Sequence, residues 1–551
     1  MRSTSEWPHR FSSIRSWRGF KPIAFFLISS LILAAMPVAR ALWDAWEFPW
    51  FGHPDQDLVF LRDGYRLSMG QPPLFGDHPG AMQIVVCAIA TKIVDVFRWL
   101  RGESLYSLVV LPSDDGWQEI FRWAKLINGV GVVGLLVSCS WMLSKWIGRG
   151  LALIWVFAVA LSLGTQVEVY QLRNEFYSAL LFFLSSGLCF GVLVDRLGEE
   201  CTGDAVVRSG LRLRQIVLPS LVFLISWVSL LAKIQSIPMF FLLDAAIVAA
   251  MLIQPKLQLR KSAVRSVLLA LAVAALGLLI LSFRFGRFDL IGGPEPFLVI
   301  ASTALGPAFV FFLNQKSPTL RASAAFVAAL VSILLGLVSL AVLPGWLDLL
   351  LKPSTAFQYV GNPSSCSSLL CRAGLGLEGI RVLFERSIDS YMLALLGAFL
   401  SLVLLALTVI QARYSLAGVA CPSRSWSLLA AAVWCYFIAV FMAMLGAQRY
   451  AVDGYLNYQQ PFLILSILIC VLITRGRLRF CWQIFTVTVL LSLVLIFGRY
   501  SSVSLKTFVT NAGPAKEGEL IRGSARDGLC SGQHKGSVWD GSSLAPYCGW
   551  K

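Results

Sequence analysis

Long apolar runs recur along this 551-residue chain, from residue 22 to residue 498, and they constrain its fold more than any other feature. A helix needs roughly 17 to 25 apolar residues to cross the hydrocarbon core of a bilayer, and about thirteen runs meet that length. Only 14% of the residues are charged and 57% are hydrophobic, a composition that excludes an ordinary soluble globular protein. The sequence therefore predicts an all-α integral membrane protein with about thirteen transmembrane helices.

The loops between the apolar runs alternate in charge. The predicted spans are 22–40, 124–143, 150–166, 175–195, 216–234, 237–253, 266–283, 297–313, 322–344, 390–411, 427–445, 461–474 and 481–498. Basic residues gather in every other loop, as the positive-inside rule expects of cytoplasmic loops, so the formal charge of +16 does not predict a nucleic-acid partner. We expect one transmembrane domain, 1–498, whose outer face carries the loop 41–123, the loop 345–388 and the tail 499–551.

The first span allows a second interpretation. The basic residues before it and Ala39-Arg40-Ala41 near its end are also typical of a cleavable signal peptide. We interpret the span as a retained anchor. Both interpretations place the loop 41–123 on the outer face.

The glycine patterns and the cysteines of this sequence do not predict a catalytic or cofactor site. Gly129, Gly131 and Gly134 spell G-x-G-x-x-G inside a predicted span, where small residues let helices pack closely. The same pattern at 374–379 follows no predicted strand and lies on the outer face, so we expect no nucleotide cofactor. Four cysteines are expected outside, where disulfides can form, and their pairing is open: Cys366, Cys371, Cys530 and Cys548.

Carboxylates and histidines gather in the segment 53–79, directly after the first span. They are His53, Asp55, Asp57, Asp63, Asp77 and His78. Charged side chains are costly near lipid, so a cluster of them at a membrane face indicates chemistry rather than packing. Asp55 also suits the alternative role of a helix N-cap, because apolar residues predict a surface helix over 58–69. A second amphipathic helix is predicted over 80–97, lying on the outer surface of the membrane.

This order of features resembles the glycosyltransferase C superfamily, membrane enzymes that include protein O-mannosyltransferases and the aminoarabinose transferases of lipid A. The resemblance rests on Asp55-Gln56-Asp57, the two predicted surface helices and Asp77-His78-Pro79, and it extends to Tyr170–Glu175 and Gln448-Arg449-Tyr450. The chain departs from the family pattern at Gln56, where many members carry an acid, and in having Pro79-Gly80 in place of a double proline.

The resemblance implies transfer of a sugar from a polyprenyl-phosphate donor to a lipid, glycan or protein acceptor on the outer face of the membrane. We expect this to be the periplasmic face of a bacterial inner membrane, because the sequence shows no obvious retention signal and no N-x-Ser/Thr acceptor without an intervening proline. Asp55 would be the general base and Asp57 a second catalytic residue, because a carboxylate can accept the proton of an attacking hydroxyl. Asp57 would also hold magnesium or manganese if the enzyme uses a metal, which the sequence leaves open. The other candidates would bind substrate: His53, Asp77, His78, Arg173, Glu175, Arg449 and Tyr450. Glu175 equally suits a helix N-terminus, and Arg449 with Tyr450 an interfacial anchor.

Two other classes of protein share parts of this pattern. An O-antigen ligase or polysaccharide polymerase would place its chemistry in the loop 345–388, with Arg372, Arg381 and Arg386 as its cations. A transporter of lipid-linked glycans would need ionisable residues near span centres and two similar halves. Asp244 is the clearest central charge, and the two halves of the chain show no matching pattern.

Overall fold

The structure of this protein is a computed structural model. It describes residues 20–46, 57–71, 73, 80–106, 112, 114–170, 172, 175–202, 212–232, 240, 243–245, 247–248, 257–292, 294–314, 403, 428, 431–439 and 460–474. The regular elements formed by these residues are all helices, which confirms the predicted all-α class for this part of the chain. Three predicted spans, 322–344, 390–411 and 481–498, lie outside the described residues apart from single positions, as do the loop 345–388 and the tail 499–551.

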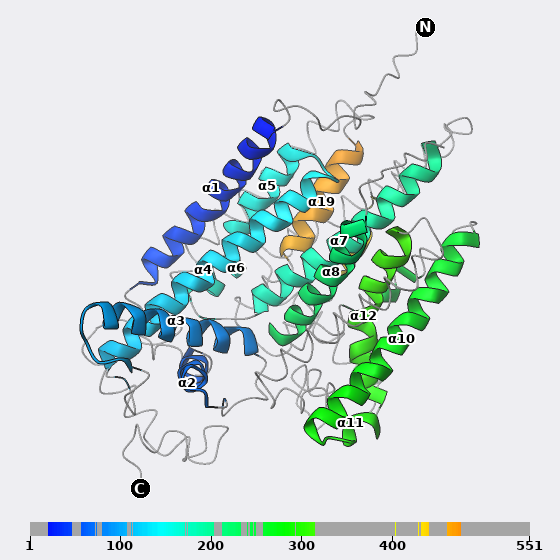
Figure 1. Cartoon of the computed structure of the whole chain (residues 1–551). Coiled ribbons are helices and arrows are strands. Elements are labelled where there is room, and N and C mark those ends of the chain that lie inside the picture. The colour runs from blue at the N-terminus through cyan, green and yellow to red at the C-terminus, as the bar shows by residue number, and fades with distance from the viewer. Residues whose placement is uncertain are drawn as a thin grey trace, which may run out of the picture.

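The helices fall into a bundle and a group at one end of it. The bundle contains α1 (Phe20–Asp44), α4 (Asp114–Ser144), α5 (Arg149–Ala160), α6 (Leu163–Tyr170), α7 (Glu175–Thr202), α8 (Arg212–Ala232), α10 (Leu257–Phe285), α12 (Pro294–Asn314) and α19 (Gln460–Thr474). The helices at the end are α2 (Asp57–Ser68), α3 (Ala81–Leu100) and α11 (Asp289–Gly292). In Figure 1 the bundle helices run obliquely up the page, and α2, α3 and α11 lie at their lower end.

Four described helices are long and apolar enough to cross a membrane. They are Pro22–Asp44, Asp115–Ser144, Lys261–Phe285 and Pro296–Leu313, and a fifth crossing arises if the bent pair α5 and α6 is one span. Shorter apolar helices occur at Phe176–Val192, Val217–Leu230 and Gln460–Cys470. These segments coincide with predicted spans, so the chain is a multi-pass integral membrane protein.

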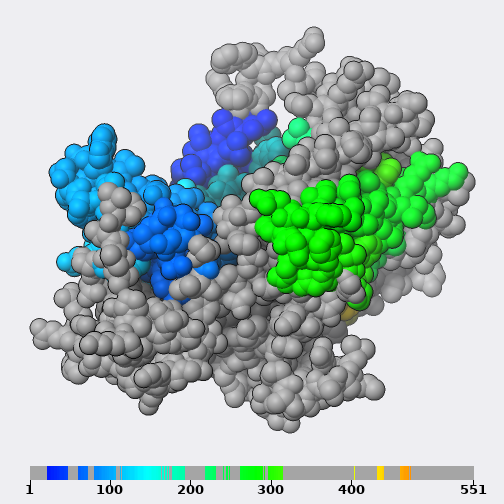
Figure 2. All heavy atoms as spheres, turned by 60° about the horizontal axis from the view of Figure 1, so that its bottom comes forward, coloured from blue at the N-terminus to red at the C-terminus, as the bar shows by residue number. Residues whose placement is uncertain are grey.

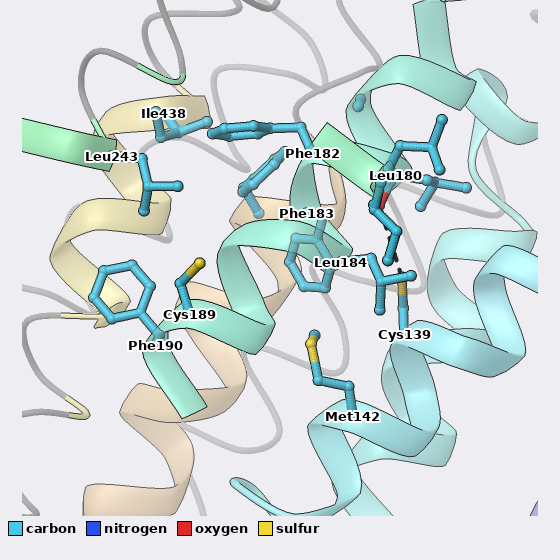
Figure 3. Close-up of a cluster of buried hydrophobic side chains, with 14 of the residues drawn as sticks. Cys139, Met142, Leu180, Phe182, Phe183, Leu184, Cys189, Phe190, Leu243 and Ile438 are labelled. Carbon is cyan, nitrogen blue, oxygen red and sulfur yellow. Dashed lines mark hydrogen bonds between the residues drawn. The ribbon is translucent and has the colours of Figure 1, made fainter. Parts of the chain in front are cut away.

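The main apolar core surrounds α7. Almost every residue from Phe176 to Phe190 is buried, and α7 packs against α4, α8 and α12. Phe182 and Phe183 point from α7 toward neighbouring segments, and Figure 3 shows them with Leu243 and Ile438 in one cluster. A helix that is apolar all round must be buried on all sides, which explains why α7 is at the centre of this core.

The predicted glycine packing in α4 is correct at two of its three positions. A Cβ on Gly129 would lie 2.9 Å from Leu42 Cδ1 of α1, and a Cβ on Gly131 would collide with the Tyr177 hydroxyl of α7. Gly134 meets no atom within 4 Å. The first two glycines therefore let α1 and α7 approach α4 closely, and the third has no packing role.

A sharp bend of 58° separates α5 from α6 in the segment predicted as one span, 150–166. Three polar side chains at the bend satisfy backbone groups that the broken helix leaves open. The Ser162 hydroxyl accepts from Thr165 N at 3.4 Å, Thr165 Oγ1 donates to Val159 O at 2.6 Å, and Gln166 Nε2 donates to Ala160 O at 2.9 Å. Broken helices are tolerated at membrane depth when such partners are present.

Candidate functional site

The helices α2 and α3 form a second, smaller core at the lower end of the bundle. Figure 1 shows α3 crosswise to α1 and α4, and α3 is not among the helices that qualify as spans. Phe60 and Tyr65 of α2 pack with Ile84 of α3 and Phe121 of α4 in this core. Both helices were predicted from the sequence, over 58–69 and 80–97, and they form within three residues of those bounds.

The crossing of α2 and α3 is close because of a glycine. A Cβ on Gly64 would collide with Cys87 Cβ and would lie 2.8 Å from Ile84 O and 2.9 Å from Ala88 N. Two of these atoms belong to the backbone of α3, so no side-chain rotation can make room. The glycine therefore fixes the distance between α2, which begins at Asp57 of the predicted acidic motif, and α3.

The predicted site residues are only partly within the described chain. Asp57 is the first residue of α2 and Glu175 the first of α7, while both side chains lie outside the description. Seven predicted residues lie wholly outside it: His53, Asp55, Asp77, His78, Arg173, Arg449 and Tyr450. Asp55 stands two residues before α2, so its predicted position just ahead of a helix agrees with the observed start of α2.

Two cations of α4 bind the end of α1, from which the acidic segment departs. Lys125 is fully buried, donates to Ala45 O and lies 4.3 Å from the centre of the Phe121 ring. Arg122 Nε donates to Trp46 O at 3.2 Å. Basic side chains stabilise the unpaired carbonyls at a helix C-terminus. The point at which the chain leaves α1 toward Asp55 is thereby fixed to α4.

A fully buried polar network lies beneath α3, where α3, α4 and α6 meet. Gln83 Nε2 of α3 donates to Asn128 Oδ1 and to Glu168 Oε1, both at 3.2 Å. Asn128 Nδ2 of α4 donates to Glu168 O at 2.7 Å. All three side chains are 0% exposed. Buried polar groups are retained at low cost only when they are paired in this way.

Glu168 also holds the start of α7. Its Oε2 accepts from Phe176 N at 3.0 Å, in the first turn of that helix. A carboxylate at this position satisfies an open backbone N–H and is favoured by the helix dipole. Glu168 thus connects the segment Tyr170–Glu175, predicted to face the first outer loop, to Gln83 of that loop.

Tyr65 of α2 is buried in the small core. Its hydroxyl donates to Tyr106 O at 2.6 Å, and its ring meets that of Trp117 edge to face. Burial, and secondly the nearby carboxylate of Asp95, raises the pKa of Tyr65 to about 12. Arg98 of α3 donates to the Tyr106 hydroxyl at 2.9 Å and pairs with Glu103 at 3.0 Å.

The sequence prediction missed the network of Gln83, Asn128 and Glu168. One signal was present, since Lys125 and Asn128 are polar, lie three residues apart at the start of an apolar run, and so share one helix face. Glu168 fell in a short predicted loop and carried no such signal. Its partners come from helices that are distant in sequence.

One acidic residue of the predicted cluster, Asp63 of α2, is buried in the protein. Asp63 is 0% exposed and accepts from Arg62 Nη2 at 3.1 Å, so this member of the predicted acidic cluster is a buried, paired group. Within the described residues, no group of three or more histidines, cysteines or acids is arranged to hold a metal ion. A magnesium or manganese ion at Asp57 stays a prediction.

Comparison with known proteins gives no relative. No family model, curated protein or solved structure matches this chain.

Proposed function

We propose that this protein is a membrane glycosyltransferase that moves a sugar from a polyprenyl-phosphate donor to a lipid, glycan or protein acceptor on the outer face of the membrane. The observation that carries the proposal is the pair α2 and α3, which lie crosswise at one end of a transmembrane bundle. Asp55-Gln56-Asp57 leads directly into α2, and Asp77-His78-Pro79 stands just before α3 in the sequence. Such an enzyme needs a polar reaction centre next to the bilayer surface, where both a lipid-linked donor and a second substrate can reach it.

The chemistry assigns a role to each part of this end of the molecule. The attacking hydroxyl must lose a proton, and Asp55 is the proposed base. The leaving lipid phosphate must be stabilised by cations or hydrogen-bond donors, for which Arg173 and Arg449 are the candidates. The Glu168 contact to Phe176 N supports this assignment, because it fixes the helix that begins two residues after Arg173.

The test is turnover by the full chain in lipid vesicles with a panel of radiolabelled polyprenyl-phosphate sugars. Removal of a general base costs roughly a factor of 10² to 10⁴ in rate, so Asp55→Asn is expected to lower transfer or slow donor hydrolysis by that amount. Asp44→Asn is the matched control, since Asp44 is a partly exposed acid at the end of α1, paired with Arg40 at 3.8 Å. The control is expected to retain full activity.

Two results would reject the assignment. Equal turnover by the parent and by a folded Asp55→Asn variant would move the base to another residue. If the parent turns over none of the donors in the panel, the proposed transferase activity is rejected for those donors. Folding of each variant is checked by its thermal unfolding in the same vesicles.

A transporter of lipid-linked sugars is the second candidate, and the bend between α5 and α6 favours it. Transporters place broken helices and buried ionisable groups at their binding sites. Here the second half of the broken helix carries the buried Glu168. The same vesicles distinguish the classes, because a transporter moves the intact donor to the other leaflet without releasing its sugar.

A further inference from the structure

Asp244 is an acidic residue in the interior of the membrane bundle. It lies near the middle of the predicted span 237–253 and is 6% exposed. Its chain neighbours Leu243 and Ile247 belong to the main apolar core around α7. Figure 3 shows Leu243 in one apolar cluster with Cys189 and Phe190 of α7.

Neither carboxyl oxygen of Asp244 has a hydrogen-bond partner among the residues that the structure describes. Cys189 of α7 is the titratable group within electrostatic range of it, and no charged side chain among the described residues acts on it. Trp434 packs on Phe190, the residue after Cys189, with ring centres 5.1 Å apart. The buried indole N–H of Trp434 has no hydrogen-bond partner among the described residues, so it does not donate to Asp244.

Glu168 shows how a buried carboxylate is held in the same molecule. One of its oxygens accepts from Phe176 N and the other from Gln83 Nε2. An ionised carboxylate without such donors would cost far more to bury than its protonated form, because the low-dielectric core cannot replace lost hydration. The two buried acids therefore differ in environment: both oxygens of Glu168 accept hydrogen bonds, and neither oxygen of Asp244 does so from a described residue.

We propose that Asp244 is a proton-binding site inside the membrane bundle, and that it carries its proton at neutral pH. An acid at this depth is retained at a cost to stability, which is typical of residues that exchange a proton or a cation during function. The proton is the ligand that fits the described surroundings, since they hold no group of three or more histidines, cysteines or acids that could bind a metal ion, and no second described carboxylate acts on Asp244. The proposal is independent of the glycosyl transfer proposed above.

The test is infrared spectroscopy of the full-length protein in lipid, with aspartate carrying ¹³C in its side-chain carboxyl group. A protonated carboxyl group absorbs in a region separate from that of a carboxylate. We expect an isotope-shifted carboxylic acid band from about pH 6 to about pH 9, where exposed aspartates are ionised. The band should disappear in Asp244→Asn and should persist in the matched variant Asp63→Asn, which removes another buried aspartate.

Three outcomes would overturn the proposal. They are the absence of a carboxylic acid band in the parent, a band that survives in Asp244→Asn, and a parent band that vanishes when sodium or potassium is added at constant pH. The last result would mean that Asp244 binds a cation instead of a proton. The parent spectrum decides the first and third outcomes even if Asp244→Asn does not fold, and Asp244→Leu offers a second way to remove the acid.

Discussion

Individual polar side chains at the lower end of the bundle are held by specific partners. Tyr65 donates to a backbone carbonyl, Lys125 caps the end of α1, and Glu168 accepts from two donors in different helices. A buried polar group that loses its partner costs about 1 to 3 kcal/mol. Single substitutions at these residues should therefore lower the stability of the protein measurably, even when they remove only one polar group.

Replacing Tyr65 by phenylalanine should show this directly. At neutral pH we expect Tyr65→Phe to lower the free energy of unfolding by about 1 to 3 kcal/mol, because the carbonyl of Tyr106 is left without its donor. The pKa of Tyr65 is raised from 10.0 to about 12 in the folded protein. The protonated hydroxyl therefore contributes stability below pH 10, and this contribution is lost as the pH rises toward 12.

Unfolding in detergent as a function of pH measures both effects. The difference in stability between the parent and Tyr65→Phe should narrow above pH 10. Tyr436→Phe is the control, because the Tyr436 hydroxyl has no hydrogen bond to the described residues, and it should change stability little at neutral pH. A constant difference across the alkaline range would contradict the role assigned to the Tyr65 hydroxyl.

At the scale of elements, close helix crossings depend on single glycines. Gly64 brings α2 against the backbone of α3, and Gly129 and Gly131 bring α1 and α7 against α4. Within a membrane the hydrophobic effect contributes little to the association of helices. Close van der Waals packing therefore supplies more of the free energy of association. The contact of α2 with α3 is the most sensitive of these crossings, because the obstructing atoms are backbone atoms.

Gly64→Ala should separate α2 from α3. We expect the unfolding free energy to fall by about 1 to 3 kcal/mol through overpacking, despite the helix-propensity gain of about 1 kcal/mol that alanine brings. Gly134→Ala is the matched control, since a Cβ there meets nothing within 4 Å and only the propensity gain applies. Equal unfolding temperatures for the two variants would show that α2 and α3 can move apart without cost.

At the scale of the whole molecule, the described helices outside the bundle lie at one of its two ends. α11, the turn between α10 and α12, lies at the same lower end as α2 and α3 in Figure 1. Figure 2 brings this end forward and shows atoms of the first loop and of α10 and α11 on one face. This agrees with the predicted topology, in which the loop 41–123 and the turn after span 266–283 are both outside.

Thiol labelling in intact bacterial cells tests this arrangement. Ser104→Cys and Ile291→Cys place cysteines at exposed positions at the lower end, and Lys261→Cys places one at the opposite end of α10. The variants are made in a chain in which the four cysteines expected outside are replaced by serine. A membrane-impermeant thiol reagent should label the first two variants and leave the third unlabelled until the membrane is opened. The five described native cysteines are buried and should react slowly. Labelling of all three in intact cells would exclude the proposed topology.

The sequence by itself determined the class of this protein and the positions of its main helices. Span length, loop charge and amphipathic spacing are properties of consecutive residues, which is why α1, α2, α3 and α12 appear close to their predicted bounds. The helix α10 ends near its predicted bound but begins at Leu257, well before the predicted start at 266. The bend inside span 150–166 was missed, since the apolar run continues through it and only the polar partners at 162–166 mark it.

Only the tertiary structure decided which polar residues meet. Gln83 and Glu168 are 85 residues apart and come together because α3 and α6 both pack on α4. Asp244 was visible in the sequence as a central charge, whereas its lack of a hydrogen-bond partner among the described residues depends on which side chains surround it in the core. Hydrogen bonding and burial are set by residues distant in the chain, so local pattern cannot separate a paired buried acid from an unpaired one.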